Sequence, residues 1–253
     1  MLLTNKSIKK TQHMMKRISI ILTAAALMSL TLSSCSDDDS YETSDNAGHG
    51  DGTYVTSGQW VDLGLPSGLL WASCNVGAEY PEQYGNYYAW GETTTKIEYN
   101  WNTYKYCMNG DYHQLTKYCS NSSYGYNGFT DNFTTMQTED DAATANLGGG
   151  ARTPYSFDWQ ELIDYTTQED FTLYGIDGKL LTASNGNSIF IPFAGERIDG
   201  RLENVGFAYY QSASLNTTEY STSIMTTYKN YYRLEMSGRD RCTGLPVRAV
   251  RQR

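Results

Sequence analysis

The sequence predicts an α+β domain with short antiparallel strands, two helices and long ordered loops. Short apolar and aromatic runs alternate with Gly, Asn, Ser and Thr, which is typical of short strands joined by turns. Apolar stripes with helical spacing are scarce. The chain has 22 tyrosines and five tryptophans, and all five tryptophans lie beyond residue 59. Together these features favour many short strands, a few helices and one folded region that begins near Gln59.

The strands are predicted from runs of β-branched and aromatic residues. The expected ranges are residues 59–63, 69–73, 87–90, 180–183, 188–193, 207–211, 231–236 and 246–250. Asn185-Gly186-Asn187 separates two of them and is a strong hairpin signal, because Asn and Gly adopt the positive φ angles of tight turns. We therefore expect residues 180–183 and 188–193 to pair.

Two stretches have the features of helices. Thr138 is the expected N-cap of the first helix, acidic residues occupy its first turn, and Gly148 ends it. Ser156 is the expected cap of the second helix, residues 156–166, in which Trp159, Leu162 and Ile163 fall on one face. That face predicts packing against a sheet.

The first 34 residues resemble a secretory signal peptide. A basic start with Lys16 and Arg17 precedes an uncharged, mostly apolar run of 15 residues, 18–32. As a helix this run would reach about 22 Å, which is short of a bilayer core of about 30 Å. The layout favours a cleaved leader over a membrane span.

The leader ends in Leu32-Ser33-Ser34-Cys35, which resembles the lipobox of bacterial lipoproteins. In that interpretation residues 1–34 are removed, and Cys35 becomes the first residue and carries acyl chains that attach the protein to a membrane. The alternative is a cysteine that lies near a conventional cleavage site. Residues 37–58 are acidic and nearly free of large aliphatics, so residues 35–58 are predicted to be a flexible tether before a domain at 59–253.

Charge excludes one class of partner. After removal of residues 1–34 the chain has 14 basic and 28 acidic side chains, a net charge of −14. Such a chain is a poor match for phosphates, so we expect no nucleic-acid partner. Membrane attachment must then come from the lipid on Cys35, because a basic patch is missing.

Histidine content argues against several kinds of catalysis. The three histidines are His13, His49 and His113, and only His113 lies in the domain. One histidine cannot build a His-rich metal site, and a Ser-His-Asp triad would depend on a residue in a polar loop. We expect no metal, no cofactor and no enzymatic activity, although paired carboxylates for glycoside hydrolysis cannot be judged from sequence.

Four cysteines remain once Cys35 is assigned to the lipid: Cys74, Cys107, Cys119 and Cys242. They allow three complete pairings. Cys107 and Cys119 would close a short loop, and that bridge would contribute roughly 2–3 kcal/mol. The alternative is that the cysteines are buried thiols.

The segment 207–232 is the most suggestive binding feature, because tyrosines alternate with small polar residues as in antibody loops. Its candidate ligand-binding residues are Tyr209, Tyr210, Gln211, Tyr220, Tyr228, Asn230, Tyr231 and Tyr232. The alternative is that these tyrosines pack a sheet, since tyrosine is a good strand former.

Several long motifs occur in a fixed order. They are VDLGLPSGLLWASCNVGA (residues 61–78), YPEQYGNYYAWGETTTK (80–96), YKYC (104–107), LTKYCSNSSYG (115–125), EDDAATANLGG (139–149), NGNSIFIPFAG (185–195) and R-x-x-G-x-x-V-R-A-V (241–250). In this order they resemble the FISUMP, or "major paralogous domain", lipoproteins of Bacteroidetes-type bacteria. Two stretches depart from the family pattern, at residues 151–155 and 209–213.

The resemblance implies a C-type-lectin-like or formylglycine-generating-enzyme-like fold in which the terminal strands, residues 59–63 and 246–250, pair. It also implies an outer-membrane protein that faces the cell exterior, since the aspartates after Cys35 resemble a surface-export signal. Some similar lipoproteins have a diversified C-terminal segment. Formylglycine-generating enzymes use a reactive cysteine pair near the C-terminal part of the fold, and only Cys242 lies there.

The leading hypothesis is a surface lipoprotein that binds a glycan or a surface protein through its tyrosine-rich C-terminal loops. Two alternatives remain: an envelope enzyme of the formylglycine-generating or hydrolase kind, and a fimbrial or adhesin subunit. An enzyme should have a deep pocket with converging titratable groups, whereas a fimbrial subunit should have an exposed strand edge.

Overall fold

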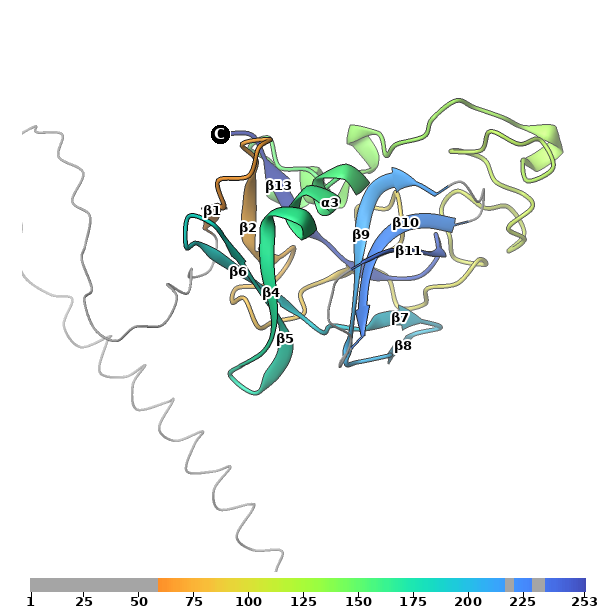
Figure 1. The fold of residues 1–253 in the computed structure, drawn as a ribbon. Helices are drawn as coiled ribbons and strands as arrows, with labels where there is room; N and C mark the ends of the chain where they lie inside the picture. Colours follow the sequence, from red (N-terminus) through yellow and green to blue (C-terminus); the bar gives the residue numbers. More distant parts are fainter. Residues whose placement is uncertain (1–58, 217–220, 229–234) are drawn as a thin grey trace, which may run out of the picture. The chain divides into compact units, whose positions relative to one another are not determined.

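The computed structural model describes residues 59–216, 221–228 and 235–253 (Figure 1). These residues form several small antiparallel sheets together with α2 (Ala142–Leu147) and α3 (Ser156–Tyr165). Short 3₁₀ turns lie at η1 (Tyr126–Gly128) and η2 (Thr138–Asp140). The predicted α+β class is confirmed. In the described part of the chain, no helix is both long and apolar enough to cross a bilayer.

Strand β2 (Leu70–Asn75) is the centre of the first sheet. It lies between β1 (Trp60–Asp62) and β13 (Arg248–Arg251), and both neighbours run antiparallel to it. Val61 and Val250 both face Trp71 in the registers of these two pairs. The prediction that the terminal strands 59–63 and 246–250 pair with each other is therefore wrong. They share a sheet, but the almost fully buried β2 separates them.

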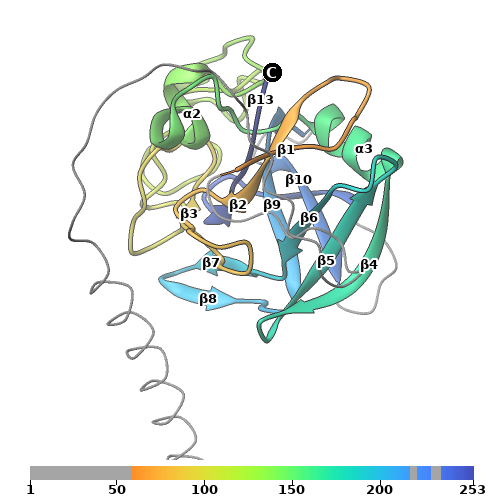
Figure 2. The same cartoon turned by 90° about the vertical axis from the view of Figure 1, so that its left-hand side faces the viewer.

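The remaining strands form hairpins and small sheets (Figure 2). One sheet has the order β4 (Thr166–Leu173), β5 (Ile176–Ala183), β6 (Ser188–Pro192), and another has β9 (Phe207–Leu215), β10 (Ser221–Tyr228), β11 (Glu235–Asp240). Two-stranded pairs are β7 (Glu196–Ile198) with β8 (Arg201–Glu203), and β3 (Tyr87–Tyr88) with β12 (Leu245–Pro246). The β5–β6 hairpin at Asn185–Asn187 is confirmed.

Helix α3 closes the main core. Trp159, Leu162 and Ile163 are buried as predicted, and the ring centroid of Trp159 lies 4.8 Å from that of Trp71. The indole Nε1 of Trp159 donates to the carbonyl of Gln211 at 2.9 Å, which ties the helix to β9. The N-cap is Tyr155, one residue before the predicted Ser156. The backbone N–H of Tyr155 donates to the carboxylate of Asp158.

Helix α2 begins later than predicted. Residues Thr138–Asp140 form a 3₁₀ turn, and the α-helix starts at Ala142 with Asp141 as its cap. The Asp141 carboxylate accepts from the N–H of Ala143 and from both the N–H and the hydroxyl of Thr153. It therefore stabilises the start of the helix and the segment that returns toward α3. The helix ends at Gly148 as predicted.

A second core is built mainly from tyrosines of the irregular segment between β3 and α2. This core buries five tyrosines: Tyr87 of β3, and Tyr99, Tyr104, Tyr106 and Tyr118 of the irregular segment. Each hydroxyl donates to a carbonyl or carboxylate, as buried tyrosines usually require. Much of the tyrosine content therefore fills the interior of the protein.

Candidate functional site

The structure places part of the predicted tyrosine site in the core. Tyr209, Tyr210 and Gln211 are 3%, 0% and 1% exposed. The Tyr210 hydroxyl donates to the carbonyl of Pro192 at 3.0 Å, and the Gln211 amide donates to the carbonyl of Tyr88 at 2.5 Å. The prediction that these three side chains contact a ligand is wrong, because packing covers them on all sides.

Four of the five other predicted ligand residues lie outside the described residues: Tyr220, Asn230, Tyr231 and Tyr232. The fifth, Tyr228, ends β10, where its backbone lies opposite Phe207. These five positions stay a prediction.

The predicted Cys107–Cys119 bridge is absent. Both cysteines are thiols. The Cys107 sulfur donates to the carbonyl of Asp111 at 3.1 Å, and the Cys119 sulfur donates to the carbonyl of Asn121 at 3.1 Å. Each thiol thus has its own backbone acceptor in the long irregular segment, so that segment is held by hydrogen bonds and packing.

Among the described residues, a pocket of about 330 Å³ is a candidate site. It is lined by residues 85–87, 95–97 and 99 and by Arg197 and Gly200 of the β7–β8 hairpin. Its size fits the lower range of small-ligand sites. A second pocket of about 250 Å³, beside β1 and β2, has only uncharged lining residues. Of these two pockets, the first has ionised groups in its lining, Lys96 and Arg197.

Two buried tyrosines form the base of this pocket. Tyr99 donates its hydroxyl to the carbonyl of Tyr87 at 2.5 Å, and Tyr87 donates to the carbonyl of Ala194 at 2.6 Å. Burial raises the pKa of both phenols above the usual value, so both stay neutral donors near neutral pH. The base is therefore rigid and polar, and it carries no charge.

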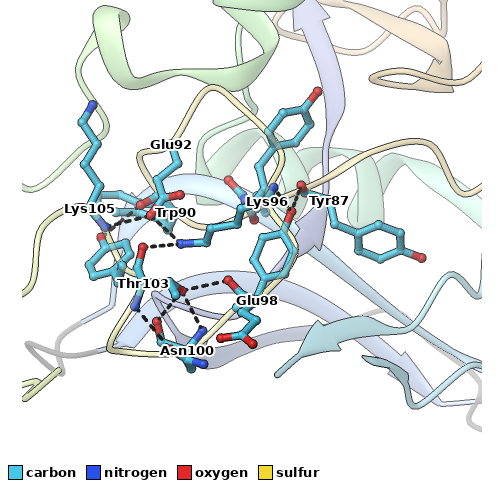
Figure 3. A network of polar contacts seen from close by, with 12 residues as sticks. Tyr87, Trp90, Glu92, Lys96, Glu98, Asn100, Thr103 and Lys105 are labelled. Atoms are coloured by element: carbon cyan, nitrogen blue, oxygen red, sulfur yellow. Dashed lines mark hydrogen bonds and ion pairs between the residues drawn. The ribbon is translucent and has the colours of Figure 1, made fainter. Parts of the chain in front are cut away.

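Lys96 lines the pocket, but its charge is already paired. Its ammonium donates to Glu92 at 2.9 Å and to the carbonyl of Thr103 at 2.8 Å (Figure 3). Glu92 also accepts from the backbone N–H of Lys105 at 2.9 Å. This network stabilises the segment that forms the pocket wall, and Lys96 supplies little free positive charge to the cavity.

Arg197 also lines the pocket, and its environment differs from that of Lys96. Its guanidinium carbon is 5.2 Å from the ring centroid of Tyr87, and no carboxylate among the described residues forms an ion pair with it. Its backbone is fixed by two hydrogen bonds to Gly244, at 2.8 and 2.9 Å. Arg197 is therefore a positioned cation at the pocket.

The hairpin that carries Arg197 has a tight turn. Asp199 and Gly200 have φ angles of 45° and 77°. The Asp199 carboxylate accepts from the amide of Asn100 at 2.9 Å. This contact joins the hairpin tip to the chain segment next to the lining residue Tyr99. This hairpin and Arg197 were not predicted from the sequence, although an Asp-Gly pair between strand-like residues is a known hairpin signal.

The described residues include few groups suited to catalysis or metal binding. No group of three or more His, Cys, Asp or Glu side chains there could hold a metal ion. His113 stacks on Tyr124, with ring centroids 5.1 Å apart, and its Nδ1 lies 3.1 Å from the carboxylate of Asp111. The structure thus places His113 in an aromatic and acidic setting away from the pocket lining.

Comparison with known proteins adds no relative: no protein-family model, curated protein or solved structure matches the chain.

Proposed function

We propose that this chain is a surface-exposed lipoprotein of the FISUMP type, anchored in an outer membrane by acyl chains on Cys35. Its folded domain is a C-type-lectin-like module that binds a glycan or another cell-surface ligand. The pocket lined by residues of the segment 85–99 and by the β7–β8 hairpin is the site. Tyr220, Tyr228, Asn230, Tyr231 and Tyr232 stay predicted as further ligand-binding residues.

The observation that carries the proposal is the composition of the pocket. Its lining combines an amide (Asn86), a hydroxyl (Thr95) and a positioned cation (Arg197). Such a mixture provides donors and acceptors for a polyhydroxylated ligand. The lining lacks histidine, cysteine and carboxylate side chains, which favours binding over covalent or acid–base chemistry at this site.

Two features of the fold support the lectin-like part of the proposal. The first and last strands of the described domain share one sheet around β2. Long segments with little regular structure are packed by their own core, as loops that present a ligand face must be.

The binding site is tested by a glycan-array screen of the mature full chain, extracted from membranes in detergent. Thr95→Trp fills the pocket from an exposed position and should abolish binding to the glycans that the native chain retains. Thr94→Trp is the matched control, because Thr94 is exposed, adjacent and outside the lining. Equal binding by both variants would move the site to the C-terminal tyrosines, and chemical turnover of an arrayed glycan would support the enzyme alternative.

The anchor is tested separately with Cys35→Ser. The native chain should partition with membranes and be cut by protease added to intact cells. The Cys35→Ser chain should lose the lipid and leave the membrane fraction. Retention of that variant in the membrane would contradict lipid anchoring at Cys35.

A further inference from the structure

The charge of the pocket contrasts with the charge of the chain. Beyond residue 34 the acidic side chains outnumber the basic ones by 28 to 14. The pocket is lined by two cationic side chains, Lys96 and Arg197, and by no carboxylate. Because Lys96 is paired with Glu92, the charge left for a ligand is that of Arg197.

We propose that this pocket binds the carboxylate of an acidic sugar residue, of the uronic or sialic acid kind, and that Arg197 makes the ionic contact. The proposal rests on the glycan-binding function above and specifies the class of glycan. It concerns Arg197 and the groups beside it, and it does not depend on the C-terminal tyrosines.

The setting of Arg197 suits recognition of a planar anion. The side chain lies against the ring of Tyr87, at 5.2 Å from the guanidinium carbon to the ring centroid, and Tyr87 is itself buried. A ring contact orients the guanidinium plane without using its N–H donors. Paired N–H donors of a guanidinium match the two oxygens of a carboxylate. The hairpin backbone is held by Gly244, so the strand that carries Arg197 is in position before a ligand arrives.

The acidic groups near the pocket leave Arg197 available. The Glu92 carboxylate accepts from the ammonium of Lys96 and from the backbone N–H of Lys105. Asp199, at the hairpin tip, accepts from the amide of Asn100. Neither carboxylate forms an ion pair with Arg197, so the guanidinium meets a ligand without first breaking an internal pair.

A neutral sugar fits this arrangement less well. It would cover the guanidinium and remove water from it without supplying a negative charge, and burying an unpaired charge is costly. Asn86 and Thr95 lie in the same lining and supply neutral donors and acceptors for the hydroxyls of the sugar ring. The pocket thus separates one ionic contact from several neutral ones.

The test uses the mature full chain in detergent and titration calorimetry with matched probes. The acidic probes are tetragalacturonate and sialyllactose. Their neutral partners are the fully methyl-esterified tetragalacturonate and lactose. We expect at least one acidic probe to bind, and its neutral partner to bind at least about tenfold more weakly, as loss of a charged hydrogen-bonded pair implies. Raising the salt concentration from about 0.01 M to about 1 M should lower the affinity for the acidic probe, because the Debye length falls from about 30 Å to about 3 Å.

Variants assign the contact to a residue. Arg197→Ala should lose about tenfold or more in affinity for the acidic probe and leave the neutral partner unchanged. Arg201→Ala removes the same charge from an exposed position on β8 outside the pocket lining, and it should bind like the native chain. Arg197→Lys keeps the charge and loses the planar fork, so an intermediate affinity is expected. Thermal melting of each variant verifies folding.

Three results would overturn the inference. They are equal binding of an acid and its neutral partner, unchanged binding by a folded Arg197→Ala chain, and a sulfated glycan that binds through Arg197 while no carboxylated probe does. A neutral glycan that binds in the pocket would leave the proposed function standing and refute only this inference. Absence of binding to every arrayed glycan would refute this inference and the glycan-binding form of the proposed function.

Discussion

Lys117 and Asp140 form an ion pair of 2.7 Å that joins the long irregular segment to the turn before α2. Lys117 belongs to one Lys-Tyr-Cys tripeptide, and a second copy of that tripeptide begins at Lys105. Each copy supplies a lysine and a tyrosine to one oxygen of Asp140: Lys117 and Tyr118 to Oδ2, and Lys105 and Tyr106 to Oδ1. One buried carboxylate therefore organises both copies.

Replacing Asp140 should destabilise the domain in a pH-dependent way. Burial alone would raise the pKa of Asp140, but hydrogen bonds from Lys117, Tyr106, Tyr118 and Lys105 outweigh it and lower the pKa from 3.8 to about 2. A depressed pKa in the folded state gives stability that is present above about pH 4 and is lost as the pH falls toward 2.

We therefore expect Asp140→Asn to lower the free energy of unfolding by about 1.5–3 kcal/mol at neutral pH, the range for hydrogen bonds to charged groups. Urea denaturation of the native and variant chains at neutral pH and at about pH 2.5 tests this. The difference should shrink in acid. A difference that is the same at both pH values would contradict a role for the ionised carboxylate.

Tyr210 should be a stability residue. Tyr210→Ala removes a fully buried ring beside Trp159 and should cost about 3–5 kcal/mol, as for other large aromatic deletions. Tyr210→Phe removes only the hydroxyl that donates to Pro192 and accepts from Asn75, and should cost about 1–2 kcal/mol. Chemical denaturation measures both, and the binding assays with the folded Phe variant should be unchanged. Loss of binding by that variant without loss of stability would restore Tyr210 to the ligand site.

The described cysteines should react as thiols. In a Cys35→Ser chain unfolded without reductant, four thiols should titrate, from Cys74, Cys107, Cys119 and Cys242. In the folded chain Cys242 should react slowly with alkylating reagents, because burial and the nearby Asp240 raise its pKa to about 12. Two thiols instead of four after unfolding would indicate a disulfide.

Alkali should unfold the domain through its buried tyrosines. Burial raises the pKa of Tyr104, Tyr106 and Tyr118 above the usual value, and it raises that of Tyr210 to about 12. Stability from these groups is present below about pH 10, the pKa in the unfolded chain, and is lost as the pH rises above it. Tyrosinate absorbance of the buried set should therefore appear together with the loss of circular dichroism. Ionisation of that set in a chain that stays folded would contradict this account.

The sequence predicted those elements whose residues are specified locally. The face of Trp159, Leu162 and Ile163 identifies α3, because a helix needs one apolar stripe to pack. Asn185-Gly186-Asn187 identifies the β5–β6 hairpin, because few residues adopt that turn. Strand β4 was missed because its residues TTQEDFTL are half exposed or exposed, so no apolar pattern marks it, and it forms by pairing with β5.

The role of the tyrosines could not be predicted from composition. Tyr210 and a paratope tyrosine have the same local sequence character, and only the approach of β6 and α3 buries Tyr210. The pocket was missed for a related reason. Arg197 is one of many charged residues in the chain, and only the fold shows that it lines a pocket without an ion pair to a carboxylate of the described residues.

Placing β2 between the first and last strands brings the two ends of the described domain together. The guanidinium carbon of Arg251 lies 4.6 Å from the ring centroid of Trp60. A circularly permuted chain, with residue 253 joined to residue 59 by a short linker and new ends at the exposed Tyr174–Gly175 turn, should keep every sheet intact. The pairing of β1 and β13 with β2 therefore does not require that the chain begin at β1.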